Sequence, residues 1–265
     1  MKTFGIDISR WQGNFNLKGA MDEGVKFVIA KGGGGDDGLY VDSKFIRNYT
    51  EAKKLGLPVG AYWFSKALTI ADAEKEAKYF IENCLKGRQF ELPVYIDVEH
   101  SEQFALGKKA LTDIIIRWLE VVEAAGYWVG IYSSTYFFSR HIEDARLQNY
   151  AHWCAEWSAK CNYKGNDGVL GMWQFGGETN VTRSNKVAGQ VCDQNYMLVD
   201  YPAKIKAAGL NGFGKSAAKP AKTVEEIAKE VIRGKWGNGQ ERKKRLTDAG
   251  YDYAAVQKKV NELMK

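Results

Sequence analysis

The stretch Leu92-Pro93-Val94-Tyr95-Ile96-Asp97-Val98-Glu99 decides the fold, because it is a run of strand-forming residues that ends in two acids. Side chains alternate between the two faces of a strand, so Asp97 and Glu99 project on one side and the apolar side chains project on the other. Two carboxylates this close repel each other, and an apolar strand offers them little water. We expect at least one of their pKa values to rise toward neutrality, which makes a proton donor usable at physiological pH.

Similar apolar runs recur along the chain and predict further strands. The eight predicted strands are residues 4–9, 27–31, 59–64, 94–99, 128–133, 152–157, 169–175 and 191–197. Amphipathic patterns between the first six predict five helices, at residues 17–23, 43–55, 70–85, 112–125 and 136–146. After the sixth and seventh strands only short loops intervene. This order predicts an α/β fold, a modified β/α barrel of eight strands and five helices whose last part is antiparallel.

Acids stand on three of these apolar strands. Asp7 lies on the first strand, Asp97 and Glu99 on the fourth, and Asp193 on the eighth. Closure of a barrel makes the first and last strands neighbours, and active residues gather where the parallel strands end. We therefore expect the four carboxylates to converge on one cleft. The alternative, four unrelated caps or solvated residues, does not explain why all four fall on apolar strands.

Aromatic and planar polar side chains are expected at the same rim. They are Trp11, Tyr40, Tyr62, Phe64, Tyr132, Trp157, Trp173 and Gln174. Aromatic faces and amide groups suit a sugar, which offers flat C–H patches beside hydroxyl and acetamido groups. Each ring taken alone is explained equally well by packing inside the barrel, so the sugar hypothesis depends on their combination with the acids.

Lys31 ends the second predicted strand, and we expect its side chain to face the cleft. The run Gly32–Gly35 follows it. This run lacks the Gly-Lys-Ser/Thr ending of a phosphate-binding loop. A flexible loop at the rim is therefore expected here.

The composition is that of an ordinary globular protein, with 45% hydrophobic and 26% charged residues among 265. No apolar run approaches the roughly 20 residues of a membrane span, so membrane insertion is not expected. The N-terminus runs directly into a strand, without a signal peptide, which predicts a protein that stays in the cytosol of the cell that makes it. The four cysteines and three histidines lack metal-ligand spacing, so we expect no metal and no cofactor.

The formal charge of +6 belongs to the C-terminal fifth of the chain. Residues 211–265 contain 13 Lys and Arg against 7 Asp and Glu, whereas the preceding residues contain 25 of each kind. A basic segment favours an anionic partner, which is a nucleic acid, a membrane surface or an acidic wall polymer. Here we predict a barrel over residues 1–208, a flexible linker over 209–222 and a three-helix module over 223–265.

Four motifs in this order resemble the glycoside hydrolase family 25 muramidases, the lysozymes common among bacteriophage endolysins. The motifs are Gly5–Gly13, Gly60–Phe64, Tyr95–Glu99 and Val191–Asn195, and the resemblance covers about residues 1–205. It implies a β/α barrel with eight strands and five helices. It also implies hydrolysis of the β-1,4 bond between N-acetylmuramic acid and N-acetylglucosamine in peptidoglycan, after release from the host bacterial cytoplasm through a separate membrane pore.

The resemblance also implies roles for individual residues. Glu99 matches the general acid of the family, and Asp97, Asp7 and Asp193 match its other active-site acids. The substrate-binding set expected from the resemblance and from the rim is Lys31, Tyr40, Tyr62, Phe64, Tyr132, Trp157 and Gln174. Whether Asp97, Asp193 or the 2-acetamido group of the substrate stabilises the anomeric centre stays open, as does the choice between retention and inversion.

The C-terminal segment resembles the cell-wall-binding repeat of the CW-seven type found in phage lysins. The resemblance lies in Ile232–Gly239, Arg242–Leu246 and Ala249–Tyr253. Taken from the residues alone, Thr223 and Glu226 form a capping box at the first of three helices, a Gly-Asn-Gly turn follows, and Gly250 ends the second helix. We expect Trp236, Leu246 and Tyr251 to form the core, with Val256 and Val260 facing it.

Three other functions compete at this point. The first is a non-catalytic glycan-binding protein, against which the complete set of acids argues. The second is a wall amidase or peptidase, for which the chain offers no histidine set with metal-ligand spacing. The third is a nucleic-acid binder, but the basic segment carries no recognised motif and its bases alternate with acids, so no nucleic acid is expected as a partner.

Overall fold

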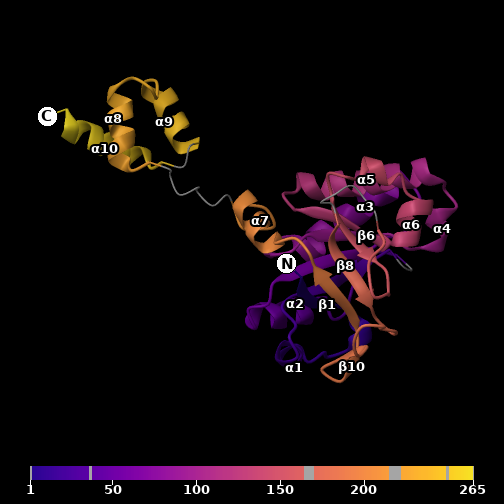
Figure 1. The fold of residues 1–265 in the computed structure, drawn as a ribbon. Helices are drawn as coiled ribbons and strands as arrows, with labels where there is room; N and C mark the ends of the chain where they lie inside the picture. The colour runs from indigo at the N-terminus through magenta and orange to yellow at the C-terminus, as the bar shows by residue number, and fades with distance from the viewer. Residues whose placement is uncertain (1, 36–37, 164–169, 215–221, 249–250, 265) are drawn as a thin grey trace. The chain divides into compact units, whose positions relative to one another are not determined.

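The computed structural model describes residues 2–35, 38–163, 170–214, 222–248 and 251–264. The chain divides into two compact units, residues 1–214 and 215–265, which are described separately below (Figure 1). The first unit ends at Gly214 rather than at the predicted residue 208. The reason is that Asn211 is buried against the barrel, where it donates to the carbonyl oxygen of Leu92 and accepts from the amide of Trp128. Residues 215–221 of the linker predicted over 209–222 lie outside the described residues.

Eight strands of the first unit form a closed barrel. They are β1 (Thr3–Ile8), β2 (Val28–Gly34), β4 (Val59–Phe64), β5 (Val94–Asp97), β6 (Val129–Ser134), β7 (Ala151–Ala155), β8 (Leu170–Gly176) and β11 (Asp193–Met197). The order around the barrel is β1-β11-β8-β7-β6-β5-β4-β2, and pairing of β2 with β1 closes it. The predicted modified barrel is confirmed, and each strand falls within a few residues of its predicted position.

Only β11 of the eight barrel strands is antiparallel to its neighbours, β1 and β8. The strands β7 and β8 run parallel, although no helix within the described residues connects them. Two smaller pairings were not predicted. The edge strand β3 (Tyr40–Val41) lies antiparallel to β2, and β9 (Lys186–Val187) pairs with β10 (Gln190–Val191).

The alternation of side chains builds two apolar layers. Residues such as Val94, Ile96 and Val98 point outward into a large cluster shared with the covering helices. Tyr95 belongs instead to a second cluster that fills the interior of the barrel. Tyr201 of helix α7 (Tyr201–Ala208) packs into this inner cluster. Because Trp128, just before β6, contacts Tyr201, α7 covers the end of the barrel where the parallel strands begin.

Helices on the outside follow most predicted patterns. They are α1 (Leu17–Asp22), α2 (Phe45–Lys54), α3 (Ile70–Phe80) continued by the π-helical turn η2 (Ile81–Leu85), α5 (Lys108–Ala124) and α6 (Thr135–Arg140). The short helix α4 (Ser101–Phe104) and the helix α7 were not predicted. The helix predicted over residues 136–146 is wrong in its second half, because the chain leaves α6 at Arg140 and re-forms only a 3-10 turn, η3 (Asp144–Arg146).

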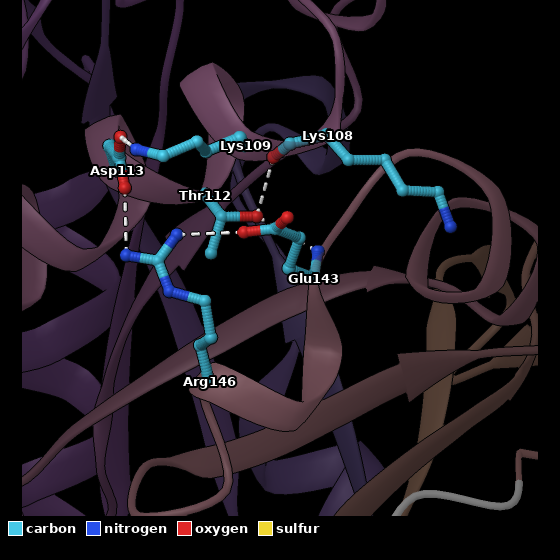
Figure 2. A network of polar contacts seen from close by, with 6 residues as sticks. All are labelled: Lys108, Lys109, Thr112, Asp113, Glu143 and Arg146. Atoms are coloured by element: carbon cyan, nitrogen blue, oxygen red, sulfur yellow. Dashed lines mark hydrogen bonds and ion pairs between the residues drawn. The ribbon is translucent and has the colours of Figure 1, made fainter.

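Polar contacts with α5 explain this break, and Figure 2 shows them. The hydroxyl of the buried Thr112 donates to the carbonyl oxygen of Lys108 at 2.7 Å and accepts from the amide of Glu143 at 2.8 Å. The guanidinium of Arg146 binds the carboxylates of Glu143 at 2.8 Å and Asp113 at 2.7 Å. The segment after α6 is therefore held by side chains of α5 instead of by helical hydrogen bonds of its own.

The glycine run after Lys31 corrects another prediction. Gly32, Gly33 and Gly34 are not a flexible loop but the end of β2, hydrogen-bonded between β4 and β3. A methyl group at Gly33 would overlap the carbonyl oxygen of Tyr40, and one at Gly32 would overlap the ring of Phe80. The glycines are needed here because a third strand approaches the backbone closely.

The described residues of the second unit form three helices, α8 (Val224–Ile232), α9 (Gly239–Asp248) and α10 (Tyr253–Leu263), which Figure 1 shows grouped together. The predicted capping box is confirmed, with Thr223 accepting from the amide of Glu226. Leu246, Val256 and Val260 form the core with three residues of α8, and Trp236, Tyr251 and Tyr253 pack against it. The predicted stop at Gly250 lies outside the described residues. None of the helices that the structure describes is long and apolar enough to cross a membrane.

Candidate active site

A cavity of about 410 Å³ opens at the end of the barrel where the parallel strands finish. It is lined by Asp7, Ile8, Ser9, Arg10, Trp11, Gln12, Lys31, Tyr62, Phe64, Lys66, Asp97, Glu99, His100 and Asp193. All four predicted carboxylates are therefore in its wall. They come from β1, from the end of β5 and from the start of β11, so the barrel brings together residues that are far apart in sequence.

Asp7 and Asp193 face each other across the β1–β11 pairing, as predicted. They are register partners in this antiparallel ladder. β11 starts where β1 ends, which places both carboxylates at the open end of the barrel. Asp7 is buried and Asp193 is half-buried, so neither side chain can be fully hydrated.

Two amide side chains hold one oxygen of Asp7. Asn195 donates to Asp7 Oδ2 at 2.7 Å, and Gln174 donates to the same atom at 3.1 Å. The amide of Asn195 is oriented in turn by the indole N–H of Trp153, which donates to its oxygen at 2.8 Å. Burial raises the pKa of Asp7 to about 6, and the hydrogen bonds from Asn195 and Gln174 limit that rise. Asp7 is thus ionised at neutral pH in a fixed orientation.

Gln174 receives two hydrogen bonds of its own. Tyr132 Oη donates to Gln174 Oε1 at 2.9 Å, and Trp157 Nε1 donates to it at 3.0 Å. These bonds occupy the amide oxygen, so the amide nitrogen is the atom that faces Asp7. None of these three residues is among those that line the cavity, and Trp157 is 41% exposed. Their hydrogen bonds orient the Asp7 carboxylate through Gln174, and their expected contact with substrate stays a prediction.

The carboxyl group of Asp193 has a strongly raised pKa. Burial, followed by the negative charges of Asp7 and Glu99, raises its pKa to about 8. The carboxyl group therefore holds its proton at neutral pH. Gly177 makes this position possible, because a methyl group there would overlap Asp193 Oδ1 and the ring of Trp157.

Asp97 and Glu99 occupy the end of β5, which stops at Asp97. Asp97 is buried between its register partners Phe64 and Tyr132, whereas Glu99 is at the mouth and is exposed. The pKa of Glu99 is raised, as predicted. The larger cause is one of the two that were expected, removal of water from the carboxylate by the surrounding cavity wall, and the positive charge of Lys31 lowers the pKa.

The half-buried Tyr62 and the buried Tyr132 lie close enough to the four acids to feel their charge. Burial raises the pKa of each phenol first, and the negative charges of all four carboxylates then raise it further. Lys31 Nζ lies over the ring of Phe64, 4.6 Å from its centroid, and is the predicted cation facing the cleft. The site therefore combines a shared negative field with one buried cation.

The remaining predicted residues differ in position. Lys31, Tyr62, Phe64 and Trp11 line the cavity, but Tyr40 does not, since it lies on β3 beneath the guanidinium of Arg10. Trp173 donates its N–H to the carbonyl oxygen of Glu156 and is also outside the lining.

Several residues of the site were missed by the sequence argument. They are Arg10, Gln12, Lys66 and His100 in the cavity wall, and Asn195 and Trp153 behind it. Strand alternation could have found Asn195, which is two residues after Asp193 and so projects on the same face. No sequence signal marks Trp153, because its contact depends on the register of separate strands. Among the described residues, no group of three or more His, Cys, Asp and Glu side chains is arranged to hold a metal ion.

Comparison with known proteins agrees with this geometry. The family model described as glycosyl hydrolases family 25 matches residues 6–183. The chain belongs to glycosyl hydrolase family 25. A second model, the CW_7 repeat, matches residues 225–264, which include most of the C-terminal helical unit.

Family 25 relatives resemble the chain in sequence and in fold. The lysozyme of Streptococcus phage Cp-7 is 29% identical over 210 residues, which are 78% of this chain and 56% of that protein. Muramidase from Acremonium alcalophilum superposes with a TM-score of 0.64 at 25% identity, over 79% of this chain and 99% of that one. The bacterial lysozyme from Streptomyces coelicolor superposes with a TM-score of 0.65 at 24% identity, over 81% of this chain and 99% of that one. The chain spans about half the length of the curated relatives that it matches.

Proposed function

We propose that this family 25 protein is an endolysin-type muramidase, which hydrolyses the β-1,4 bond between N-acetylmuramic acid and N-acetylglucosamine in peptidoglycan. The observation that carries the proposal is the convergence of Asp7, Asp97, Glu99 and Asp193 on one cavity. A glycosidase needs a carboxylic acid that keeps its proton near neutral pH and further carboxyl groups that interact with the anomeric centre. Glu99 is assigned to the first need, because it is at an accessible mouth and because burial raises its pKa above the usual range, which is the direction that a general acid requires.

Glu99 is assigned the role of general acid. Its proton passes to the glycosidic oxygen as the bond from that oxygen to the anomeric carbon breaks. The resulting carboxylate then takes a proton from the water that attacks the sugar, which restores the acid. Lys31 stabilises the carboxylate form of Glu99 between these two transfers.

Asp97 and Glu99 come from the same end of one strand, an arrangement unlike two carboxylates that flank a bond from opposite sides. We therefore assign the nucleophile to the 2-acetamido oxygen of the substrate, with Asp97 accepting the acetamido N–H. Retention of configuration follows from this assignment. The protonated Asp193 donates a hydrogen bond to the sugar, and Asp7 holds the network in place.

The C-terminal unit is assigned to wall binding. It matches the CW_7 repeat, and residues 211–265 carry the net positive charge of the chain. Peptidoglycan is the proposed ligand, and anionic wall polymers are a second class of partner that a basic surface attracts. The bacterial wall is thus the proposed place of action. Synthesis in the host cytoplasm and release through a separate membrane pore stay predictions.

Digestion of purified Gram-positive peptidoglycan tests the proposal. Mass spectrometry of the products identifies the bond that is cut, and a new reducing end at N-acetylmuramic acid is expected. Liberated amino groups would mean an amidase or peptidase, and binding without new reducing ends would mean a non-catalytic glycan-binding protein. Proton NMR of the first products, with retained β-configuration expected, tests the assignment of the acetamido nucleophile separately.

A further inference from the structure

One part of the cavity wall is not used by the proposed chemistry. It is the 3-10 turn η1 (Arg10–Gln12), which follows β1 at the lip of the cavity. Trp11 exposes 78% of its surface there, and Arg10 is also exposed. A tryptophan this exposed contributes little to the core. Its place beside the four carboxylates therefore raises the question of what it contacts when substrate is bound.

The backbone that carries Trp11 is fixed. Ser9 Oγ accepts from the amide of Trp11 at 3.2 Å, and the side chain of Gln12 accepts from the amide of Ser9 at 2.9 Å, which completes a capping box. Asp42 accepts from the amide of Arg10 at 3.0 Å and ties the turn to the segment after β3. The indole is thus presented to solvent from a constrained turn, which lowers the entropic cost of stacking a ligand on it.

Arg10 is arranged as an anion receptor beside this ring. Its guanidinium carbon lies 5.3 Å from the ring centroid of Trp11 and 5.1 Å from that of Tyr40. In the described part of the chain these rings are its side-chain contacts, and it forms no ion pair there. A guanidinium held between rings keeps its donor edge available for a carboxylate.

We propose that Trp11 and Arg10 form a substrate subsite at the cavity lip, where Trp11 stacks on a sugar ring and Arg10 pairs with a carboxylate carried by the same glycan. The proposal rests on the proposed function, since it concerns the substrate of that cavity. A wall lined by four acidic residues disfavours an anionic ligand, and a cation at the lip offsets this repulsion. In peptidoglycan the carboxylate comes from the stem peptide or, where the peptide has been removed, from the lactyl group of muramic acid.

Calorimetric binding in a Glu99→Gln background tests the subsite without turnover. Three soluble glycan probes are compared: fragments with stem peptides, fragments stripped of peptide that have free lactyl carboxylates, and stripped fragments whose carboxylates are converted to methylamides. The variants are Trp11→Ala, Arg10→Ala and Arg10→Lys. Arg183→Ala is the matched control, because Arg183 also lies over a ring, that of Phe4, but away from the cavity. Thermal unfolding shows that each variant folds.

We expect Trp11→Ala to weaken binding of all three probes about threefold to tenfold, the scale of one aromatic contact. Arg10→Ala is expected to weaken binding of the carboxylate probes only, by about twofold to fivefold and by more at low salt. Arg10→Lys keeps the positive charge and is expected to retain part of this affinity. The carboxylate probe whose affinity falls in Arg10→Ala identifies the source of the carboxylate. A loss in Arg10→Ala that is as large for the neutral probe as for the carboxylate probes would overturn the subsite. So would unchanged affinity in Arg10→Ala or in Trp11→Ala. A muramidase assay that fails with the unmodified protein overturns the proposed function instead.

Discussion

At Gly177 the absence of a side chain leaves room for two groups of the site. A methyl group would overlap Asp193 Oδ1 and the ring of Trp157, and the backbone there lies outside the left-handed region, so the constraint is steric alone. Gly177→Ala is expected to displace Asp193 and to lower kcat/KM about tenfold to hundredfold, because small shifts of positioned groups are costly. Steady-state kinetics on soluble fragments, with circular dichroism as a check of folding, measure this. An unchanged kcat/KM in a folded variant would show that Asp193 has no positional role.

Asp193 also gives the protein a predicted pH dependence of stability. Its folded pKa, about 8, is above the unfolded value near 4, so the folded state binds more protons between these values. The free energy of unfolding therefore falls as pH rises from about 4 to 8. Asp193→Asn removes this loss and is expected to stabilise the protein by about 1–3 kcal/mol at pH 7.5, with little effect at pH 4.

Denaturant unfolding across this pH range measures the effect of Asp193→Asn. Asp22→Asn, which changes an exposed acid on α1, is the control and should leave the pH dependence unchanged. An Asp193→Asn variant that is no more stable than the unmodified protein at pH 7.5 would mean that the carboxyl ionises freely in the fold.

At the scale of single elements, the contact between α5 and the segment after α6 offers a test of a buried hydroxyl. Thr112→Val keeps the shape of the side chain but leaves the amide of Glu143 without its acceptor. A buried unsatisfied donor costs about 1–3 kcal/mol, so the free energy of unfolding should fall by that amount. Hydrogen exchange at the Glu143 amide should accelerate in Thr112→Val and stay slow in Thr112→Ser, which keeps the hydroxyl. If the Glu143 amide exchanges at the same rate in Thr112→Val and Thr112→Ser, the lower free energy of unfolding is due to changed packing instead.

Strands were predicted more accurately than helix ends, and the reason is physical. A strand such as β5 is defined by its own alternation and its own apolar residues, which the sequence displays directly. The end of α6 and the glycines of β2 depend on partners far away in sequence, namely Thr112 on α5 and Tyr40 on β3. The sequence pattern around a residue does not indicate such distant partners. The helix predicted over residues 136–146 and the loop predicted after Lys31 were wrong for this reason.

The residues of the site also differ in whether the sequence could predict their roles. The four acids could be predicted because each interrupts an apolar strand and because barrel closure places their strands together. The roles of Gln174, Trp157 and Tyr132 could not, since the hydrogen bonds to Gln174 depend on the registers of three strands and a loop.

At the scale of the whole molecule, two compact units should unfold and act separately. Leu246 is fully buried in the small core of the C-terminal unit. Leu246→Ala should cost about 2–5 kcal/mol, close to the whole stability of a module this small. We expect calorimetry to show loss of a transition of the module, weaker wall binding in sedimentation assays, and unchanged hydrolysis of soluble fragments. Leu263→Ala, at an exposed position of α10, is the matched control. A parallel loss of hydrolysis in Leu246→Ala would contradict separate action.

Glu99 is assigned as the residue that gives its proton to a glycosidic bond in this cavity. The most direct measurement is the rate of reducing-end release from soluble peptidoglycan fragments by Glu99→Gln, compared with Glu102→Gln, which changes an exposed acid three residues away. We expect kcat to fall by about 100-fold to 10,000-fold in Glu99→Gln, which is the usual contribution of a general acid. We expect no change of kcat in Glu102→Gln. A folded Glu99→Gln variant with near-normal kcat would contradict the assignment.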